Sequence, residues 1–322
     1  MRRKTITKFT SLLLSLILTI LVIPLSQITV FAATSGDYQY RINREDNTAE
    51  LTNYKGSETE LVIPSEFDGH RVTSIKDAFS SCKSVQKVTI PASIKSISEG
   101  AFSNCRSLKE VIIEEGIQSI EYQAFHFCNA LEKINFPKSL KTIGDEAFYF
   151  CTSLGGHLVL DSVESIGSMA FYGCEALESL IVSSDIKNIG KEAFQFCKSI
   201  KYISIYGSVT NMESKAFFGC DALENVLITG TTQIIGDHAF FTCDKLKNIV
   251  LIGEVGSIGD LAIPRDTRIH KLGNNITGSV FSSGNTVLLL GGGFLLGAIV
   301  TAIGITAIKK KKKRRGKCVN II

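Results

Sequence analysis

Apolar residues recur at fixed spacings within a short unit that is repeated through the centre of the chain. The unit that begins at residue 101 shows the pattern in Ala101, Phe102, Cys105, Leu108, Val111, Ile113, Ile117 and Ile120. The alternation through Val111 and Ile113 predicts a short β-strand with one face toward a core. The three-residue spacing at Ile117 and Ile120 predicts a tight arc that turns the chain back. Each unit therefore predicts one coil of a larger winding.

The unit recurs at a constant interval of 23 residues. Its Ala-Phe pair begins at residues 78, 101, 124, 147, 170, 193, 216 and 239, and a cysteine follows each Phe by three positions. One coil cannot bury its own apolar residues, whereas stacked coils place equivalent residues about 4.8 Å apart in ladders. A period of this length lies in the range of leucine-rich repeats. We therefore predict a repeat solenoid: a leucine-rich-repeat right-handed superhelix with a parallel β-sheet, eight 23-residue coils plus terminal caps, followed by one transmembrane helix.

The fourth coil departs from this pattern by one residue. Its apolar pair Leu158 and Leu160 falls one position later than the inward sites of the other coils. Because a slip of one residue would invert the faces of the strand, the extra residue must be absorbed nearby. We expect the turn at Gly155 and Gly156 to absorb it, which makes His157 a strand-edge residue rather than a ligand.

The N-terminal side of the repeats predicts an exported chain. Residues 1–32 have the pattern of a signal peptide, with a basic start, an apolar stretch at 12–23 and a small-residue cleavage site that ends at Ala32. Residues 33–55 alternate around a polar turn and predict a hairpin that caps the first coil. Residues 56–264 form the predicted solenoid.

The C-terminal side predicts a membrane anchor. Residues 265–286 are rich in Gly, Asn, Ser and Thr, which favours a closing segment and a flexible stalk. Residues 287–308 carry no charge and as a helix would span roughly 33 Å, enough for a hydrocarbon core of about 30 Å. Residues 309–322 are basic and should stay in the cytoplasm. The prediction is a single-pass cell-surface protein whose N-terminal part lies outside. A cell-wall sorting signal is an alternative, but no Leu-Pro-x-Thr-Gly precedes the span.

Charge argues against nucleic acid as a partner. Of the 35 Lys and Arg residues, 12 lie at the two ends, so residues 33–286 keep 35 − 12 = 23 cations against 31 acidic residues, a net charge of −8. A negatively charged ectodomain lacks the electrostatic basis for binding phosphate backbones.

The histidines and cysteines of the chain indicate structural roles rather than catalytic ones. The five histidines share no spacing with a serine, cysteine or carboxylate that would suggest a nucleophile or an acid–base pair, so we predict no enzyme activity and no cofactor. Cysteines at the same place in every coil have parallel Cβ vectors, whereas a disulfide needs them to converge. A ladder also spreads the thiols along a line, which argues against zinc. We predict buried, unpaired thiols.

The solvent-facing column of the predicted strands is a candidate partner-binding surface. Aligned apolar residues on the surface of a repeat protein are common binding sites, although β-branched residues also favour exposed strand positions for their own sake. Two tyrosines flank the column and suit an interface. The predicted partner-binding residues are Ile112, Val159, Ile181, Tyr202, Tyr206, Leu227 and Val250.

A second aromatic group lies between the recurrent Phe and Cys of each unit, at one edge of the solenoid. We expect these rings to pack against adjacent loops, because isolated surface aromatics are disfavoured. The group comprises Phe127, Tyr149, Phe150, Tyr172, Phe196, Phe218 and Phe241.

The run from Asp37 to about Gly259 closely resembles the BspA-like leucine-rich-repeat family, also called the Treponema pallidum type. The resemblance lies in the Ala-Phe-x-x-Cys signature, in Ile-Pro or Phe-Pro at 63–64, 90–91 and 136–137, and in Ser-Ile-Gly at 165–167 and 257–259. It implies a surface or secreted protein of a bacterium or a protist that binds host or matrix proteins or mediates attachment. It transfers no catalytic or ligand-binding residue.

Two functions remain open at this stage. The first is a cell-surface protein that binds protein or glycan partners in adhesion to host cells, matrix or other microbes. The second is a structural cell-envelope protein whose solenoid is a spacer or a self-associating layer. Gly293 and Gly297 form one GxxxG in the predicted span and would permit weak self-association. Asn275 begins a glycosylation sequon that matters only in a eukaryote.

Overall fold

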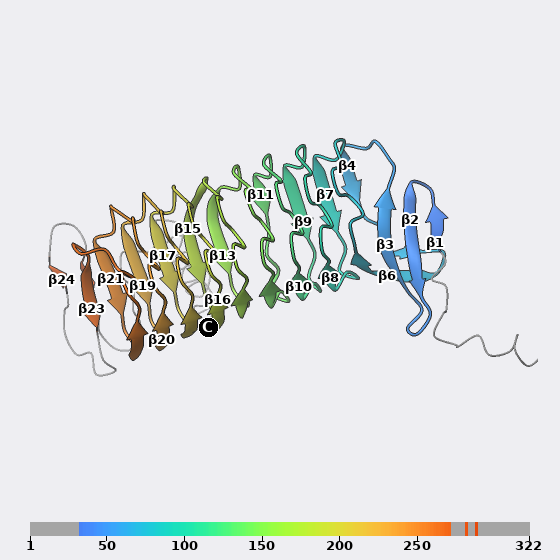
Figure 1. Ribbon diagram of the computed structural model, residues 1–322. Helices are drawn as coiled ribbons and strands as arrows, with labels where there is room; N and C mark the ends of the chain where they lie inside the picture. Colours follow the sequence, from blue (N-terminus) through green and yellow to red (C-terminus); the bar gives the residue numbers. More distant parts are fainter. Residues whose placement is uncertain (1–31, 272–280, 283–286, 289–322) are drawn as a thin grey trace, which may run out of the picture.

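The described chain is an elongated parallel β-solenoid (Figure 1). The computed structural model describes residues 32–271, 281–282 and 287–288. These residues wind into about ten turns of about 23 residues each. The predicted signal peptide lies outside the described residues except for Ala32, and the predicted membrane span lies outside them except for Val287 and Leu288. Within the described ranges, no helix is both long and apolar enough to span a bilayer.

One side of the solenoid is a continuous sheet that runs its whole length. Its thirteen strands follow the order β1-β2-β3-β6-β8-β10-β12-β14-β16-β18-β20-β22, with β5 paired to β6. The strands are β1 (Ala32–Ser35), β2 (Tyr38–Asn43), β3 (Thr48–Tyr54), β5 (Glu66–Phe67), β6 (His70–Ile75), β8 (Ser96–Ile97), β10 (Ser119–Ile120), β12 (Thr142–Ile143), β14 (Ser165–Ile166), β16 (Ile186–Ile189), β18 (Val209–Met212), β20 (Thr232–Ile235) and β22 (Val255–Ile258).

The other side of the solenoid carries two separate parallel sheets. A four-stranded sheet has the order β11-β9-β7-β4, and a six-stranded sheet has the order β13-β15-β17-β19-β21-β23. The strands are β4 (Glu60–Val62), β7 (Lys87–Ile90), β9 (Glu110–Ile113), β11 (Lys133–Ile134), β13 (Gly156–Leu160), β15 (Leu177–Val182), β17 (Tyr202–Ile205), β19 (Asn225–Ile228), β21 (Asn248–Leu251) and β23 (Arg268–Lys271). A further antiparallel pair joins β24 (Phe281–Ser282) to β25 (Val287–Leu288).

The solenoid fold is confirmed, but the number of turns was underestimated. Both end regions also coil: β3 pairs in parallel with β6 before the first full repeat, and β23 pairs in parallel with β21 after the last. Their sequences lack the Ala-Phe-x-x-Cys signature, so the repeat count missed them. At the N-terminal end β1, β2 and β3 form an antiparallel meander, in which β1 had no signal in the alternation pattern.

The core consists of ladders of identical side chains. Consecutive Phe rings from Phe79 to Phe240 stack with centroids 4.8 to 5.3 Å apart and with planes within 7° of parallel. Each of these rings is at most 1% exposed. The Ala, Cys, Leu and Ile positions of the repeat form equivalent buried ladders. Coil-on-coil stacking therefore supplies the burial that one unit cannot provide.

The fourth coil absorbs its extra residue at the place predicted. Leu158 and Leu160 are buried in the core, and the register between β13 and β15 shifts between Gly156 and His157. A Cβ on Gly156 would meet no atom within 4 Å, so space does not restrict this position. Its φ of +74° does, because glycine adopts this conformation without strain. The offset coincides with the break between β11 and β13. On the opposite side β12 and β14 stay paired, so the break interrupts one side only.

Candidate binding face and interstrand pocket

The six-stranded sheet presents two columns of side chains away from the core. In each strand from β13 to β21 the alternate residues lie in the core cluster, from Leu158 and Leu160 in β13 to Ile249 and Leu251 in β21. The intervening residues therefore point outward. We call these ten outward residues the neutral face, which consists of His157, Ser179, Tyr202, Asn225 and Asn248 in one column and Val159, Ile181, Ser204, Leu227 and Val250 in the other.

The neutral face contains no Asp, Glu, Lys or Arg, although charged residues make up 20% of the chain. The four-stranded sheet differs, because its corresponding column holds Glu60, Lys87, Glu110 and Lys133. There Lys87 and Glu110 form an ion pair of 3.1 Å. Depletion of charge is the compositional mark of the centre of a protein interface. The break between the sheets thus separates a column of charged residues from a column that is uncharged as far as Asn248, beside which Arg268 lies on β23.

Hydrogen bonds along the polar column hold its side chains in register. His157 Nδ1 lies 2.8 Å from Ser179 Oγ, and Asn248 donates from Nδ2 to Asn225 Oδ1 over 2.9 Å. His157 was expected to be a strand-edge residue, and the structure places it in this column beside the break. Of this column only Tyr202 was among the predicted partner-binding residues, although two asparagines 23 residues apart were a usable signal.

The seven predicted partner-binding residues do not form one surface. Ile112 lies on the four-stranded sheet, across the break from the others. Val159 and Tyr206 are 42% and 40% exposed, and Ile181 and Tyr202 are half-buried. These four residues, Val159, Ile181, Tyr202 and Tyr206, form the accessible part of the prediction.

Leu227 and Val250 correct the prediction of a fully solvent-facing column. They are only 5% and 4% exposed, yet neither belongs to the core cluster, so they are outward residues that are nonetheless covered. Because the strands pair in register, each outward side chain has the equivalent residue of the next coil on either side. Leu227, for example, lies between Ser204 and Val250. Val159 has a paired neighbour, Ile181, on one flank only, because the sheet stops on the other.

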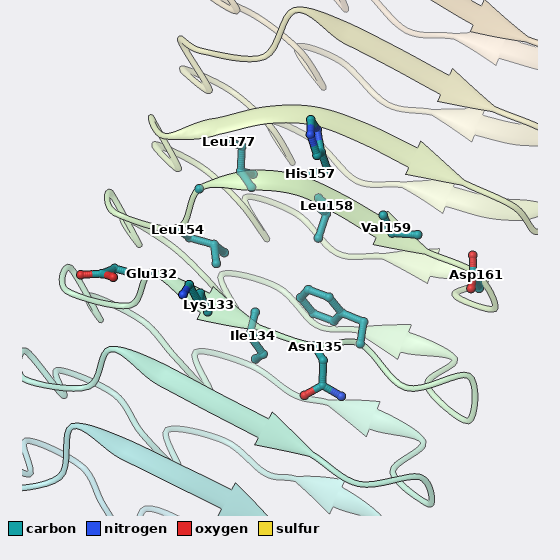
Figure 2. A pocket seen from close by; sticks show the side chains of 12 residues that line it. Glu132, Lys133, Ile134, Asn135, Leu154, His157, Leu158, Val159, Asp161 and Leu177 are labelled. Carbon is teal, nitrogen blue, oxygen red and sulfur yellow. The ribbon is translucent and has the colours of Figure 1, made fainter. Parts of the chain in front are cut away.

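A pocket of about 330 Å³ lies between β11 and β13, at the break (Figure 2). Its walls contain both apolar and polar residues, which come from both strands, from the turn before β13 and from Leu177 at the start of β15. Polar residues stand around it, with Glu132 and Lys133 at one end and Asp161 at the other, as Figure 2 shows. The apolar lining residues are Ile134, Phe136, Leu154, Leu158, Val159 and Leu177.

Asn135 and Phe136 explain why the strand before the pocket is short. The Asn135 side chain accepts from the Ile113 N–H over 2.7 Å and donates to the Ile113 carbonyl over 2.7 Å, so a side chain replaces a further backbone rung between β9 and β11. The Phe136 ring points forward along the axis, with its centroid 5.7 Å from that of Phe148 and 6.4 Å from that of Phe171. Asn135 is thus hydrogen-bonded to the preceding coil, and Phe136 packs against Phe rings of the following coils. Neither residue pairs with β13.

The cysteine ladder packs as free thiols. The prediction of free thiols is confirmed for the eight described cysteines, seven of which are buried and one, Cys82, half-buried. From Cys105 onward each thiol donates to the carbonyl of the Phe at the start of the preceding unit, over 2.9 to 3.3 Å. Burial raises the pKa of Cys151, Cys174 and Cys197 well above that of a free thiol, which keeps them protonated.

The second aromatic group packs as predicted. His126, Tyr149 and Tyr172 stack with centroids 5.1 and 5.0 Å apart. A Cβ on Gly219 would come within 2.6 Å of the Phe196 ring, so this ring fills the space that a larger residue would need. Among the described residues no group of three or more His, Cys, Asp or Glu is placed to hold a metal ion.

The stacked coils, the two-sided sheet arrangement and the outward columns define a repeat scaffold of the leucine-rich-repeat class. Residues 73–157 and 157–270 match the model of the BspA type leucine-rich repeat region, in six copies. The chain belongs to this BspA-type leucine-rich-repeat family.

Solved structures include similar proteins. The leucine-rich repeat protein of T. pallidum is 31% identical, with 60% of this chain and 91% of that chain covered and a TM-score of 0.54. A leucine-rich repeat protein from Bacteroides ovatus is 18% identical, with 75% and 100% covered and a TM-score of 0.48. A leucine rich cell surface protein from Faecalibacterium prausnitzii is 21% identical, with 77% and 96% covered and a TM-score of 0.47. No curated protein matches the sequence.

Proposed function

We propose that this chain is a cell-surface recognition protein that binds a protein or glycan partner through the neutral face and mediates attachment. The observation that carries the proposal is the absence of charge from the six accessible positions of the neutral face, which are His157, Val159, Ile181, Tyr202, Asn225 and Asn248. The other four positions, Ser179, Ser204, Leu227 and Val250, are at most 5% exposed. A charged residue on a solvated sheet stays hydrated and costs little free energy. At the centre of an interface it would have to be desolvated on binding, so charged residues are depleted there. The signal peptide, the stalk, the membrane span at 287–308 and the basic cytoplasmic tail belong to this proposal.

The accessible part of the neutral face, extended by Tyr206 directly after β17, is suited to an anchor. Val159 and Tyr206 are exposed, and Ile181 and Tyr202 are half-buried. Tyrosine combines a large apolar ring with a hydroxyl that forms hydrogen bonds, and it is enriched among residues that dominate binding energy. The covered residues Leu227 and Val250 would support this patch without contacting a partner.

The test uses the full-length chain in detergent against an array of host glycoproteins, matrix proteins and microbial surface preparations. The Tyr206→Ser variant should lose about tenfold in affinity for any partner found, as expected for an interface tyrosine. Tyr122→Ser is the matched control, because Tyr122 is 42% exposed but lies on a turn away from the sheet. Equal losses in both variants, or saturable binding to none of the array, would count against recognition by this face. Concentration-dependent oligomers with no outside partner would favour the structural-envelope function.

A further inference from the structure

The interstrand pocket is a second feature of the surface that the repeat pattern alone does not require. Other neighbouring strands on this side pair directly within their sheets, whereas β11 and β13 share no ladder rung. The Gly155 N–H donates to the Glu132 carbonyl over 3.5 Å before β13, and the Glu164 N–H donates to the Lys141 carbonyl over 2.8 Å after it. Between these two hydrogen bonds, β11 and β13 are not paired.

The pocket has the size and lining for one long side chain. Its volume of about 330 Å³ lies at the lower end of the range for ligand pockets, roughly 300 to 1,000 Å³. Ile134, Phe136 and Leu158 supply apolar parts of its lining. Such walls suit the hydrocarbon stem of an amphipathic side chain whose polar end reaches solvent.

Charge at the rim selects a cation. Glu132 and Lys133 offset each other at one end, whereas Asp161 is the charged lining residue at the other end, as Figure 2 shows. Asp161 accepts one hydrogen bond through Oδ1, from Ser183 Oγ over 3.1 Å. None of the ion pairs in the described part of the chain involves Asp161. The net charge of −8 over residues 33–286 (23 cations against 31 acids) would also draw a basic partner toward this surface.

We propose that the interstrand pocket takes up one arginine or lysine side chain from an extended segment of a protein partner. The stem lies against Ile134, Phe136 and Leu158, and the cation pairs with Asp161. Since Val159 belongs both to the pocket and to the neutral face, the same partner can contact both. This inference rests on the proposed function, for which it names the chemistry of the partner.

The experiment measures fluorescence anisotropy of labelled, terminally blocked heptapeptides with the full-length chain in detergent. The peptides have the sequence Thr-Val-Thr-X-Thr-Val-Thr, with Arg, Lys, Gln, Leu or Glu at X. The Arg and Lys peptides should bind most tightly, and their advantage should shrink as salt is raised, because an exposed ion pair is screened.

Three variants separate the pocket from its surroundings. Asp161→Asn should weaken binding of the Arg peptide about threefold and make it equal to the Gln peptide, as expected for loss of one exposed ion pair. Val159→Phe should weaken all peptides about tenfold or more, because a larger side chain narrows the mouth of the pocket. Glu224→Gln removes the same charge from a distant coil and should change nothing; circular dichroism checks that every variant is folded.

Three results would overturn the proposal. They are equal binding of the Arg, Leu and Glu peptides, an Arg preference that survives in Asp161→Asn, and absence of binding by every peptide at millimolar concentration. The array tests the proposed function separately. A partner that binds normally to Asp161→Asn but not to Tyr206→Ser would refute the pocket and support the neutral face.

Discussion

Replacing Phe171 by alanine should destabilise the solenoid more than any change at its surface. The Phe171 ring is fully buried and stacks between Phe148 and Phe194, with centroid distances of 5.0 and 5.1 Å. It also meets the edge of Phe136 at 6.4 Å. Truncation of a buried Phe costs about 3 to 5 kcal/mol, and stacked partners put this site toward the upper part of that range. We expect a loss of about 4 kcal/mol in the free energy of unfolding.

Urea titration followed by circular dichroism measures this loss. With a slope of about 2 to 3 kcal/mol/M, the midpoint should fall by about 1.5 M. Phe196→Ala is the matched control, because it deletes the same ring from a half-buried edge position one coil further on, where about 1 kcal/mol is expected. A loss below about 1 kcal/mol for Phe171→Ala, or one no larger than that of the control, would refute the view that the Phe ladder holds the coils together.

Three further predictions follow from the packing and the titrating groups. Gly219→Ala should cost about 1 to 2 kcal/mol by urea unfolding, because φ is +69° and the new Cβ meets the Phe196 ring; a cost that persists undiminished in a Phe196→Ala background would contradict the clash. Among the eight described cysteines, an aromatic disulfide reagent at pH 8 should modify half-buried Cys82 first and the buried thiols only on unfolding; rapid reaction at Cys174 would contradict its raised pKa. Burial lowers the pKa of His126 below its usual 6.5, despite the opposing effect of Glu146, so the unfolded chain takes up a proton first and the free energy of unfolding falls as the pH drops through about 6.5. His126→Asn should reduce this slope between pH 7.5 and 5.5, and an unchanged slope would exclude His126 as its source.

Sequence periodicity predicts the coil, the ladders and the absorption of the extra residue at Gly155 and Gly156. Each of these depends on spacing within one unit, and a period of 23 residues repeats that information in every copy. The end coils were missed because β3 and β23 pair through backbone groups while their side chains depart from the signature. Backbone pairing leaves no residue-specific mark in a sequence.

The candidate site was less predictable, since exposure depends on neighbours in three dimensions. The alternation correctly placed Leu227 and Val250 on the outward side, yet nothing local to either residue indicates that it is covered. The pocket depends on two separate causes, the offset before Leu158 and the turning of Asn135 toward Ile113. The offset was visible in the sequence. The orientation of the Asn135 side chain was not, because it depends on contacts with the preceding coil.

The thiol ladder makes cohesion of the coils independent of oxidation. The described cysteines contribute as small apolar side chains that each donate a weak hydrogen bond to the neighbouring coil, and the described solenoid contains no disulfide among them. Folding of these coils therefore requires no disulfide, and every coil closes by packing alone. The solenoid should refold fully in a reducing buffer, whereas oxidants that modify the thiols of the unfolded chain should block the buried ladder from forming.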